Sequence, residues 1–243
     1  MASVDIVLPV LNEEHVLERS VRALHAFASD NLAHEWRIVI ADNGSTDQTF
    51  TIAKRLAAEL PSVIASHVPE AGRGRALTHA WLDSNADVQA YMDIDLSTDL
   101  EALPRLISAV CDQGYDVAAG SRLGPQSETT RSLKREVLSR GYVLLIELLF
   151  GGHLRDTQCG FKAIRRQAAQ QLLPLTQDTG WFWDTELLLL AHKGGWRLTF
   201  LPVRWVEDSD SRVKVVSTVW RDLKGLARMR RFDWSKARKP ANV

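Results

Sequence analysis

The sequence predicts an α/β protein of three layers (αβα), in which helices cover both faces of a mostly parallel central sheet. Three observations lead to this fold class. Short apolar runs rich in β-branched residues alternate with longer segments of helical periodicity. The 243 residues are enough for one sizeable domain, and no linker rich in Pro, Gly or Ser divides them. Alternation at these lengths is typical of parallel strands joined by helical crossovers.

The first 120 residues carry this alternation. The expected strands are 4–10, 36–42, 62–68, 87–93 and 116–120. The expected helices are 13–28, 47–60, 73–85 and 100–113. Asn12 is the candidate N-cap of the first helix, and Ser45 or Thr46 is the candidate cap of the second. Ligands bind beyond the carboxyl ends of such strands, so the residues after each strand are candidate site residues.

Beyond residue 120 the alternation is lost, and residues 121–210 are expected to elaborate the same domain. A polar loop at 124–130 precedes a helix at 132–150, and a polar segment at 155–161 follows it. A further helix near 184–192 and a strand at 198–206 complete this half. Residues 211–243 are expected to form a basic C-terminal helix or tail.

The charge distribution is more informative than the net charge, which is zero. From Ser211 onward there are ten Lys and Arg residues but only two acids, Asp222 and Asp233. A segment of this kind suits an anionic surface such as phospholipid headgroups, and a solvated tail is the alternative. It also permits a nucleic-acid binder, but no recognition motif supports one.

The cysteines and the apolar runs indicate in which part of the cell the protein is expected. Cys111 and Cys159 form no C-x-x-C pair and suggest no disulfide framework, so a reducing cytosol fits. No signal peptide is recognised at the start of the chain, and no apolar run approaches the roughly 20 residues of a membrane-spanning helix.

Polar residues follow the first two expected strands. The first strand runs into "PVLNEE" instead of the G-x-G-x-x-G of a dinucleotide-binding protein, which argues against an NAD-binding site. The second runs into "ADNGSTD", where Asp42 could accept hydrogen bonds from a base or a ribose. A simple turn between strand and helix is the alternative for this motif.

Glycines and arginines alternate in "AGRGRAL" at the expected start of the third helix. Gly72 and Gly74 would let the backbone approach a ligand, and Arg73 and Arg75 could bind phosphate oxygens. The free N–H groups and dipole of a helix N-terminus also favour an anion. A flexible loop with exposed arginines is the alternative.

Two carboxylates, Asp93 and Asp95, follow the fourth expected strand in "AYMDIDLSTD". In an extended segment their side chains would share a face, opposite Met92 and Ile94. Carboxylates so placed repel each other unless a cation or a proton lies between them. Mg²⁺ is typically held by one or two carboxylates and by substrate phosphate oxygens. The pair therefore predicts a metal bridge to a diphosphate, and helix capping by one Asp is the alternative.

Taken together, "VLPVLNEE", "ADNGSTD", "GRGRA", "DIDLS", "GSR" and "RDTQCGFK" resemble a family 2 glycosyltransferase with the Rossmann-like GT-A fold. Within this family the chain is similar to the dolichyl- and polyprenyl-phosphate sugar synthases. "DTQCGFK" followed by "WFWDTELL" looks most like the dolichyl-phosphate β-glucosyltransferase branch. The resemblance extends from about residue 4 to about residue 231.

The resemblance implies transfer of a sugar from a nucleotide sugar to a polyprenyl phosphate, with inversion at the anomeric carbon. Residues 1–120 would be the nucleotide-sugar-binding half, and residues 121–210 the acceptor-binding half. The residues implied for the nucleotide sugar are Pro9, Asn12, Glu13, Asp42, Asn43, Gly72 and Arg73. Those implied for Mg²⁺ or Mn²⁺ on the diphosphate are Asp93 and Asp95. Those implied for the acceptor phosphate are Arg122, Arg131 and Arg135, and those beside the sugar or acceptor are Gln158, Asp184 and Arg212.

The chemistry of such a transfer agrees with these residue types. A metal would stabilise the charge that builds up on a nucleoside diphosphate leaving group. A phosphate monoester, whose second pKa is about 6, is already largely ionised and needs no strong base. A hydroxyl acceptor would need one, and Asp184 is then the candidate, because Glu186 lies on another side of the same helix and suits a structural salt bridge. Asp93, Asp95, Arg122 and Asp184 are the expected catalytic residues.

Such an acceptor implies a membrane surface as a partner. Residues 143–150 and 221–239 could attach the protein to it, with Trp220, Phe232 and Trp234 as anchors. For 143–150 a buried core helix is the favoured interpretation. We therefore expect a peripheral protein at the cytoplasmic face of the membrane. A homo-oligomer or a membrane-spanning partner is left open. The rival hypotheses are another donor such as GDP-mannose or a UDP-N-acetylhexosamine, a saccharide hydroxyl acceptor, and a non-catalytic binding module.

Overall fold

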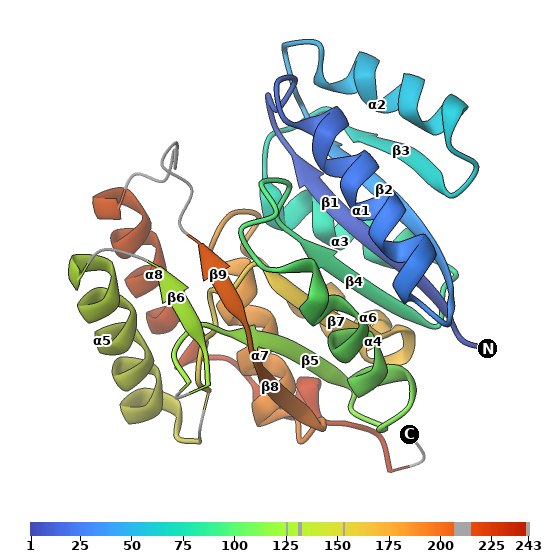
Figure 1. The fold of residues 1–243 in the computed structure, drawn as a ribbon. Helices are drawn as coiled ribbons and strands as arrows, with labels where there is room; N and C mark the ends of the chain where they lie inside the picture. Colours follow the sequence, from blue (N-terminus) through green and yellow to red (C-terminus); the bar gives the residue numbers. More distant parts are fainter. Residues whose placement is uncertain (125, 131–132, 153, 207–214, 242–243) are drawn as a thin grey trace.

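A seven-stranded sheet, ordered β3-β2-β1-β4-β7-β5-β8, forms the centre of the protein (Figure 1). The computed structural model describes residues 1–124, 126–130, 133–152, 154–206 and 215–241. The strands of the sheet are β1 (Ser3–Val10), β2 (Glu35–Asn43), β3 (Val63–Val68), β4 (Val88–Met92), β5 (Val117–Ser121), β7 (Phe161–Arg165) and β8 (Leu198–Pro202). The five strands expected in the first half are all present, and both halves of the chain share this one sheet.

The sheet is mostly parallel, as the sequence predicts, but β7 is antiparallel to both of its neighbours, β4 and β5. This strand was missed, because Lys162 interrupts its apolar run and the segment before it reads as a polar loop. The side chain of Lys162 is fully buried and is bound to a carboxylate on a helix. A tertiary ion pair therefore allows a lysine at the centre of the sheet.

Helices cover both faces and form two separate cores, which confirms the three-layer fold. On one face are α1 (Leu17–Asn31), α2 (Thr49–Glu59) and α4 (Leu103–Cys111). On the other are α3 (Arg73–Asp83), α6 (Arg166–Leu172) and α7 (Trp183–Lys193), with α5 (Leu133–Phe150) and α8 (Val215–Met229) packed outside them. Short 3₁₀ helices are η1 (Leu100–Ala102), η2 (Leu173–Leu175) and η3 (Trp234–Ala237).

The two expected helix caps are wrong. The N-cap of α1 is Val16, and Asn12 instead adopts a φ of 55° and accepts the backbone N–H of Thr46 at 2.8 Å. The N-cap of α2 is Gln48, and Ser45 Oγ accepts the backbone N–H of Asn12 at 2.9 Å. The loops after β1 and β2 therefore bind each other, which fixes the relative positions of two strand ends.

The strand expected at 198–206 is split between two sheets. After β8 the chain continues into β9 (Arg204–Val206), which pairs in parallel with β6 (Glu128–Thr130) to form a small second sheet. Thr98, from the loop after β4, bridges to Trp205 of β9. The second half of the chain therefore reaches over the carboxyl end of β4. No helix within the described residues is long and apolar enough to cross a membrane.

Because β7 lies between the two halves of the sheet, its side chains should contribute strongly to stability. Phe161 is fully buried in the core that contains α1, α2 and α4. We expect Phe161→Ala to lower the free energy of unfolding by about 3–5 kcal/mol, because apolar contacts are lost and a cavity remains. Urea unfolding followed by circular dichroism measures the change.

Leu82 on α3 is the control, because 41% of this residue is exposed. Leu82→Ala should change the free energy of unfolding by about 0.5 kcal/mol or less. Equal effects of the two substitutions would contradict the central position of β7.

Candidate active site

The two acidic residues after β4 lie on a turn. The strand ends at Met92, and the N–H of Leu96 donates to the carbonyl of Asp93 at 3.2 Å. The expectation of an extended segment is therefore wrong, although Met92 and Ile94 are buried as predicted. Asp93 is partly buried and Asp95 is exposed, and Asp95 Oδ1 accepts the N–H of Ser97 at 2.9 Å. The turn presents both carboxylates at the edge where β1, β2 and β4 end.

Arg73, the first residue of α3, connects this turn to α7. Its Nη2 donates to Asp93 Oδ1 at 2.7 Å, and its Nη1 donates to Asp184 Oδ2 at 2.5 Å. The guanidinium lies between two aromatic rings, 5.0 Å from the centre of Tyr91 and 4.9 Å from that of Trp181. Gly72 before it has a φ of 158°, and a Cβ there would come within 2.8 Å of the Thr179 carbonyl. The close contact between Gly72 and the backbone at Thr179 fixes the position of Arg73 at the start of α3.

Asp184 is a buried carboxylate that contacts several polar side chains. In addition to Arg73, its Oδ1 binds Lys162 Nζ at 2.8 Å and the hydroxyl of Tyr91. Burial alone would raise the pKa of Asp184, but the charges of Lys162 and Arg73 outweigh it and hold the pKa below its ordinary value. Burial and the neighbouring Asp184 charge raise the pKa of Tyr91. Asp184 is therefore a buried anion with its partners in place, which suits an orienting residue better than a base.

Gly160 fixes the position of Asp93 from the other side. Its carbonyl accepts the N–H of Asp93 at 3.2 Å. A Cβ on Gly160 would overlap the Asp93 carboxylate. A side chain at position 160 would therefore displace the Asp93 carboxylate, because the backbone before β7 packs directly against the acidic turn.

Asp42 at the end of β2 has an unsatisfied oxygen. It is fully buried, and its Oδ2 is 2.7 Å from His67 Nδ1. Its Oδ1 is buried and has no hydrogen-bond partner among the described residues. A buried acceptor without a partner is costly, which favours a ligand that donates an N–H or O–H there.

The other residues expected around a nucleotide mainly hold the loops together. Asn43 Nδ2 donates to the Val10 carbonyl at 2.7 Å, and Asn43 Oδ1 accepts the N–H of Gly72 at 3.0 Å. The N–H of Glu13 donates to Thr49 Oγ1 at 2.7 Å. Pro9 is buried within β1 opposite Ala41. These residues position the edge of the site.

A second ion pair lies beyond β5. Arg122 donates to Asp156 through Nε at 2.8 Å and through Nη2 at 3.0 Å, and its guanidinium faces the Trp205 ring at 5.4 Å. The charge of Asp156 outweighs the effect of burial and raises the pKa of Arg122. Arg131 and Arg212 lie outside the described residues. Arg135 falls in α5, and its side chain is outside them as well.

Asp222 of α8 is a site neighbour that sequence reasoning missed. Its Oδ2 accepts a hydrogen bond from Gln158 Nε2 at 2.7 Å, while its Oδ1 has no partner among the described residues. Burial raises the pKa of the Asp222 carboxyl to about 7. The only signal in the sequence is a single acid in an otherwise basic helix. Glu186, on another side of α7, binds Arg228 of α8 at 2.9 Å, as the salt-bridge alternative proposed.

Residues 5–173 match the family described as Glycosyl transferase family 2. The chain belongs to this family. It is 39% identical over 225 residues to the glycosyltransferase AglD of Haloferax volcanii, covering 92% of this chain but only 35% of AglD. It is also 30% identical to the dolichyl-phosphate β-glucosyltransferase ALG5A of Trichomonas vaginalis, covering 86% of this chain and 68% of that protein. The chain therefore spans about a third of the length of AglD.

Solved structures support the fold. The chain matches a glucosyl-3-phosphoglycerate synthase of Mycobacterium tuberculosis, crystallised with Mn²⁺ and UDP-glucose, with a TM-score of 0.69. The match covers 100% of this chain and 82% of that one at 18% sequence identity. The fold is therefore GT-A, as the motifs predict.

The acidic turn fits a metal that is shared with a substrate. Among the described residues no group of three or more His, Cys, Asp or Glu side chains could hold an ion. Asp93 and Asp95 supply two carboxylates at an accessible edge, and 38% of the Asp93 side chain is exposed. One or two carboxylates with phosphate oxygens are a common set of ligands for Mg²⁺.

The raised pKa of Asp222 predicts a pH dependence of stability. The folded protein keeps this proton up to about pH 7, whereas the unfolded chain loses it near pH 4. The unfolded state binds fewer protons in this window, so this carboxyl lowers the stability as the pH rises. Asp222→Asn cannot titrate, and its stability relative to the unmodified protein should rise from about pH 5 to about pH 8.

Urea unfolding at several pH values measures this difference. The control is Asp233→Asn, because Asp233 is exposed and its pKa is lowered by the Ser235 side chain and backbone. This control should follow the unmodified protein across the window. Parallel curves for Asp222→Asn and the unmodified protein would show that Asp222 is already ionised in the folded state.

Proposed function

We propose that this protein is an inverting, metal-dependent glycosyltransferase that moves glucose from UDP-glucose to a polyprenyl or dolichyl phosphate. The observation that carries the proposal is the acidic turn of Asp93 and Asp95 beside the start of α3, with Arg73 bound to Asp93. The names of the relatives supply the substrate class, since several are dolichyl-phosphate β-glucosyltransferases. The site would act at the cytoplasmic face of a membrane.

The donor would lie along the ends of β1, β2 and β4. Asp42 Oδ1, buried without a partner among the described residues, would accept a hydrogen bond from the base or the ribose. Asp93 and Asp95 would hold Mg²⁺ or Mn²⁺, which would stabilise the negative charge of the leaving diphosphate. Gly72 and Arg73 would border the diphosphate at the N-terminus of α3, where backbone N–H groups favour anions.

The state of Asp184 favours a phosphate acceptor over a hydroxyl acceptor. A hydroxyl must lose its proton to a base, but Asp184 is buried, bound to Lys162 and Arg73, and has a lowered pKa. A phosphate monoester is already largely ionised at neutral pH, because its second pKa is about 6. We therefore assign Asp184 the role of holding Arg73 against Asp93, with no direct contact with the substrate.

Arginines would offset the repulsion between the acceptor phosphate and the donor diphosphate. Asp156 orients the guanidinium of Arg122, and we propose that Arg122 binds the acceptor phosphate together with Arg131 and Arg135. The backbone N–H of Gln158 donates to Asp156 Oδ1 at 3.3 Å. We propose that Gln158 and Arg212 border the sugar and the acceptor. The ionised acceptor phosphate would itself be the nucleophile, so the protein need supply neither a nucleophile nor a base.

Product formation tests the proposal. The purified chain would be given Mg²⁺ and a short-chain polyprenyl phosphate, with UDP-glucose, UDP-galactose, UDP-N-acetylhexosamines and GDP-mannose in separate reactions. We expect a lipid-phosphate hexose, detected by mass spectrometry, from UDP-glucose. Product from another donor instead would show that the transferred sugar is not glucose. Nucleotide binding without product from any donor would favour a hydroxyl acceptor or a non-catalytic binding module.

We expect Asp93→Ala and Asp95→Ala each to lower turnover about a hundredfold or more, because each removes a carboxylate that would hold the metal on the diphosphate. Turnover is measured with saturating donor and Mg²⁺. The control is Asp83→Asn at the end of α3, whose side chain is 70% exposed. Unchanged turnover in both alanine variants would disprove the metal assignment.

Gly160→Ala tests the positioning of Asp93 without changing its charge. The added Cβ would overlap the Asp93 carboxylate, so the carboxylate must move. We expect a loss of turnover approaching that of Asp93→Ala. The matched control is Gly141→Ala in α5, because a Cβ there has no neighbour within 4 Å. Full activity of Gly160→Ala would show that the position of Asp93 is not critical.

A further inference from the structure

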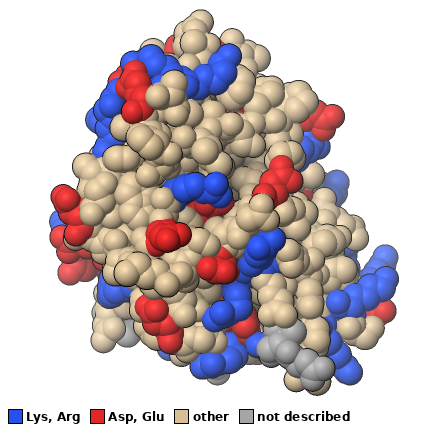
Figure 2. Space-filling view, turned by 90° about the vertical axis from the view of Figure 1, so that its right-hand side faces the viewer, with Lys and Arg blue, Asp and Glu red and all other residues tan. Residues whose placement is uncertain are grey.

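One exposed aromatic side chain lies at the edge of the candidate active site. All eight tryptophans belong to the described residues, and two of them are exposed, Trp181 at 42% and Trp220 at 61%. Trp220 belongs to α8, and Trp181 lies two residues before α7. The face seen in Figure 2 carries interspersed basic and acidic side chains, which is usual for a surface that meets only water. A large exposed apolar ring beside a buried ion cluster needs another explanation.

The packing of its neighbours does not account for Trp181. In the run "WFW" at 181–183, Phe182 and Trp183 are both buried. Trp183 Nε1 also donates to Thr78 Oγ1 of α3 at 2.8 Å. These two side chains attach the start of α7 to the core, whereas Trp181 belongs to neither of the two cores.

Trp181 is the outer layer of a stack of three groups. The guanidinium of Arg73 lies 4.9 Å from the centre of the Trp181 ring and 5.0 Å from that of Tyr91. Tyr91 is fully buried, so the stack begins in the core and ends at the surface. Because Arg73 covers one face of the indole, the exposed part of Trp181 lies on the remainder of the ring. A flat apolar surface is therefore presented next to Arg73.

The segment that carries Trp181 is held in place before any ligand binds. The backbone N–H groups of Gln177 and Asp178 donate to Glu186 Oε2 at 3.1 and 2.8 Å. The Thr179 carbonyl accepts the N–H of Arg75 at 3.2 Å. A ring on a fixed segment loses little conformational freedom when a ligand stacks on it.

The proposed path of the donor leads to this ring. Asp42 near the end of β2 and Asp93 after β4 would hold the base or ribose and the diphosphate, and β1 lies between these strands. Neighbouring strands are about 4.8 Å apart, so the donor would cross about 10 Å from one to the other. Its sugar would continue towards β7 and β5, where Arg122 would hold the acceptor phosphate. Trp181, stacked on the guanidinium that binds Asp93, borders that position.

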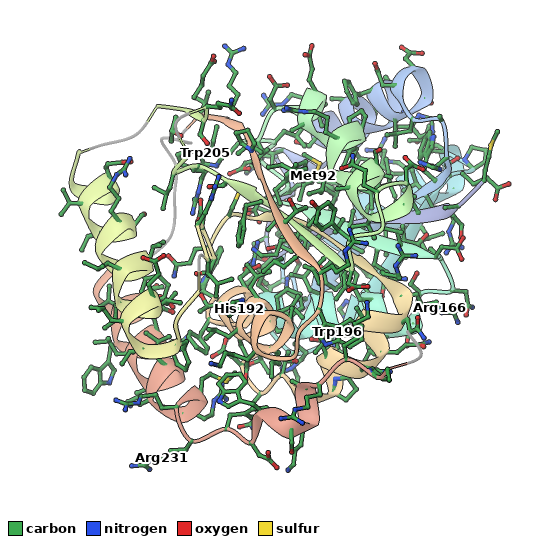
Figure 3. All side chains as sticks on the ribbon, turned by 90° about the horizontal axis from the view of Figure 1, so that it is seen from below. Met92, Arg166, His192, Trp196, Trp205 and Arg231 are labelled. Carbon is green, nitrogen blue, oxygen red and sulfur yellow. The ribbon has the colours of Figure 1, made fainter. Side chains whose placement is uncertain are left out.

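A second tryptophan near the acidic turn is explained by packing. Trp205 of β9 faces Arg122 and bridges to Thr98, which lies in the loop after β4. Figure 3 shows Trp205 and Met92, the last residue of β4, towards the same side of the view. Trp205 is partly buried against the core that contains α1, α2 and α4. Trp181 has no such contact and is free to receive a ligand on its ring.

We propose that Trp181 is a binding residue for the donor, on which the pyranose ring of the transferred hexose stacks. This inference deepens the proposed function and rests on it for the position of the diphosphate. The face of an indole ring carries partial negative charge, and the C–H groups of a pyranose carry partial positive charge. The hydroxyls at C2, C3 and C4 of glucose are equatorial, so its ring presents C–H groups on both faces.

A purely structural role makes a different prediction. If Trp181 only held Arg73 in place, its loss would disturb the diphosphate and the sugar together. If it binds the sugar, its loss should weaken UDP-glucose and leave UDP unchanged, because UDP lacks the sugar. Comparing these two ligands therefore separates the two roles.

Isothermal titration calorimetry tests the proposal. The full chain would be titrated with UDP and with UDP-glucose, in the presence of Mg²⁺ and without acceptor. We expect Trp181→Ala to weaken UDP-glucose binding about tenfold and to change UDP binding less than about twofold. Trp181→Phe, which keeps an aromatic face, should restore most of the lost affinity. An equal loss for both ligands, or no loss for either, would overturn the proposal.

The control is Leu82→Ala on α3, because Leu82 is 41% exposed and thus matches Trp181 in exposure. It should bind both ligands like the unmodified protein. Circular dichroism and thermal unfolding verify that each variant is folded. A tenfold loss of UDP-glucose affinity in the control as well would show that the effect is not specific to Trp181, and would overturn the proposal.

Turnover with a short-chain polyprenyl phosphate separates this inference from the proposed function. Trp181→Ala should raise the KM for UDP-glucose about tenfold and change kcat less, since stacking holds the sugar in the ground state and in the transition state alike. A selective loss of UDP-glucose binding, without turnover in any variant, would support the stacking and disprove the proposed function. Turnover with an unchanged KM in Trp181→Ala would do the reverse. Binding of neither UDP nor UDP-glucose by the unmodified protein would disprove both.

Discussion

The architecture of the site depends on one buried ion cluster, in which Asp184 is held between Lys162 and Arg73. Removing two or more charges from water is costly, and the cost is offset only if opposite charges and hydrogen bonds are in place. Here Asp184 and Asp93 balance Lys162 and Arg73, and the Tyr91 hydroxyl supplies a further hydrogen bond. These groups come from β4, β7, α3, α7 and the turn after β4. The cluster therefore joins both halves of the chain at one point.

This cluster also explains why the acidic turn can be both accessible and fixed. Arg73 holds Asp93 on one side, and the backbone at Gly160 packs against it on the other. Removing the partner of a buried charge typically costs about 3–5 kcal/mol, so the arrangement resists displacement of Asp184 or Lys162. A carboxylate that is held in place before a diphosphate arrives needs little reorganisation when the substrate binds. Stability and the proposed chemistry thus depend on the same contacts.

Helix α8 is held against its neighbours by one acidic and one basic side chain of its own, Asp222 and Arg228. Asp222 binds Gln158 and Glu186 binds Arg228, while Arg221, Lys224 and Arg231 remain exposed. One side of the helix therefore contacts Gln158 and α7, and the other side carries exposed basic residues.

The sequence by itself determined the fold class, the five strands of the first half, and the motifs after β1, β2 and β4, because hydrophobic periodicity and turn residues are local signals. It also predicted Asp93, Arg73 and Asp184 as site residues, on motif resemblance. Only the tertiary structure decided that these three are bound to one another, since the contact between Arg73 and Asp184 spans 111 residues of chain. Strand β7 and the partner of Asp222 were equally inaccessible from the sequence. Each depends on which distant segment packs against it, and periodicity in a single segment carries no information about that.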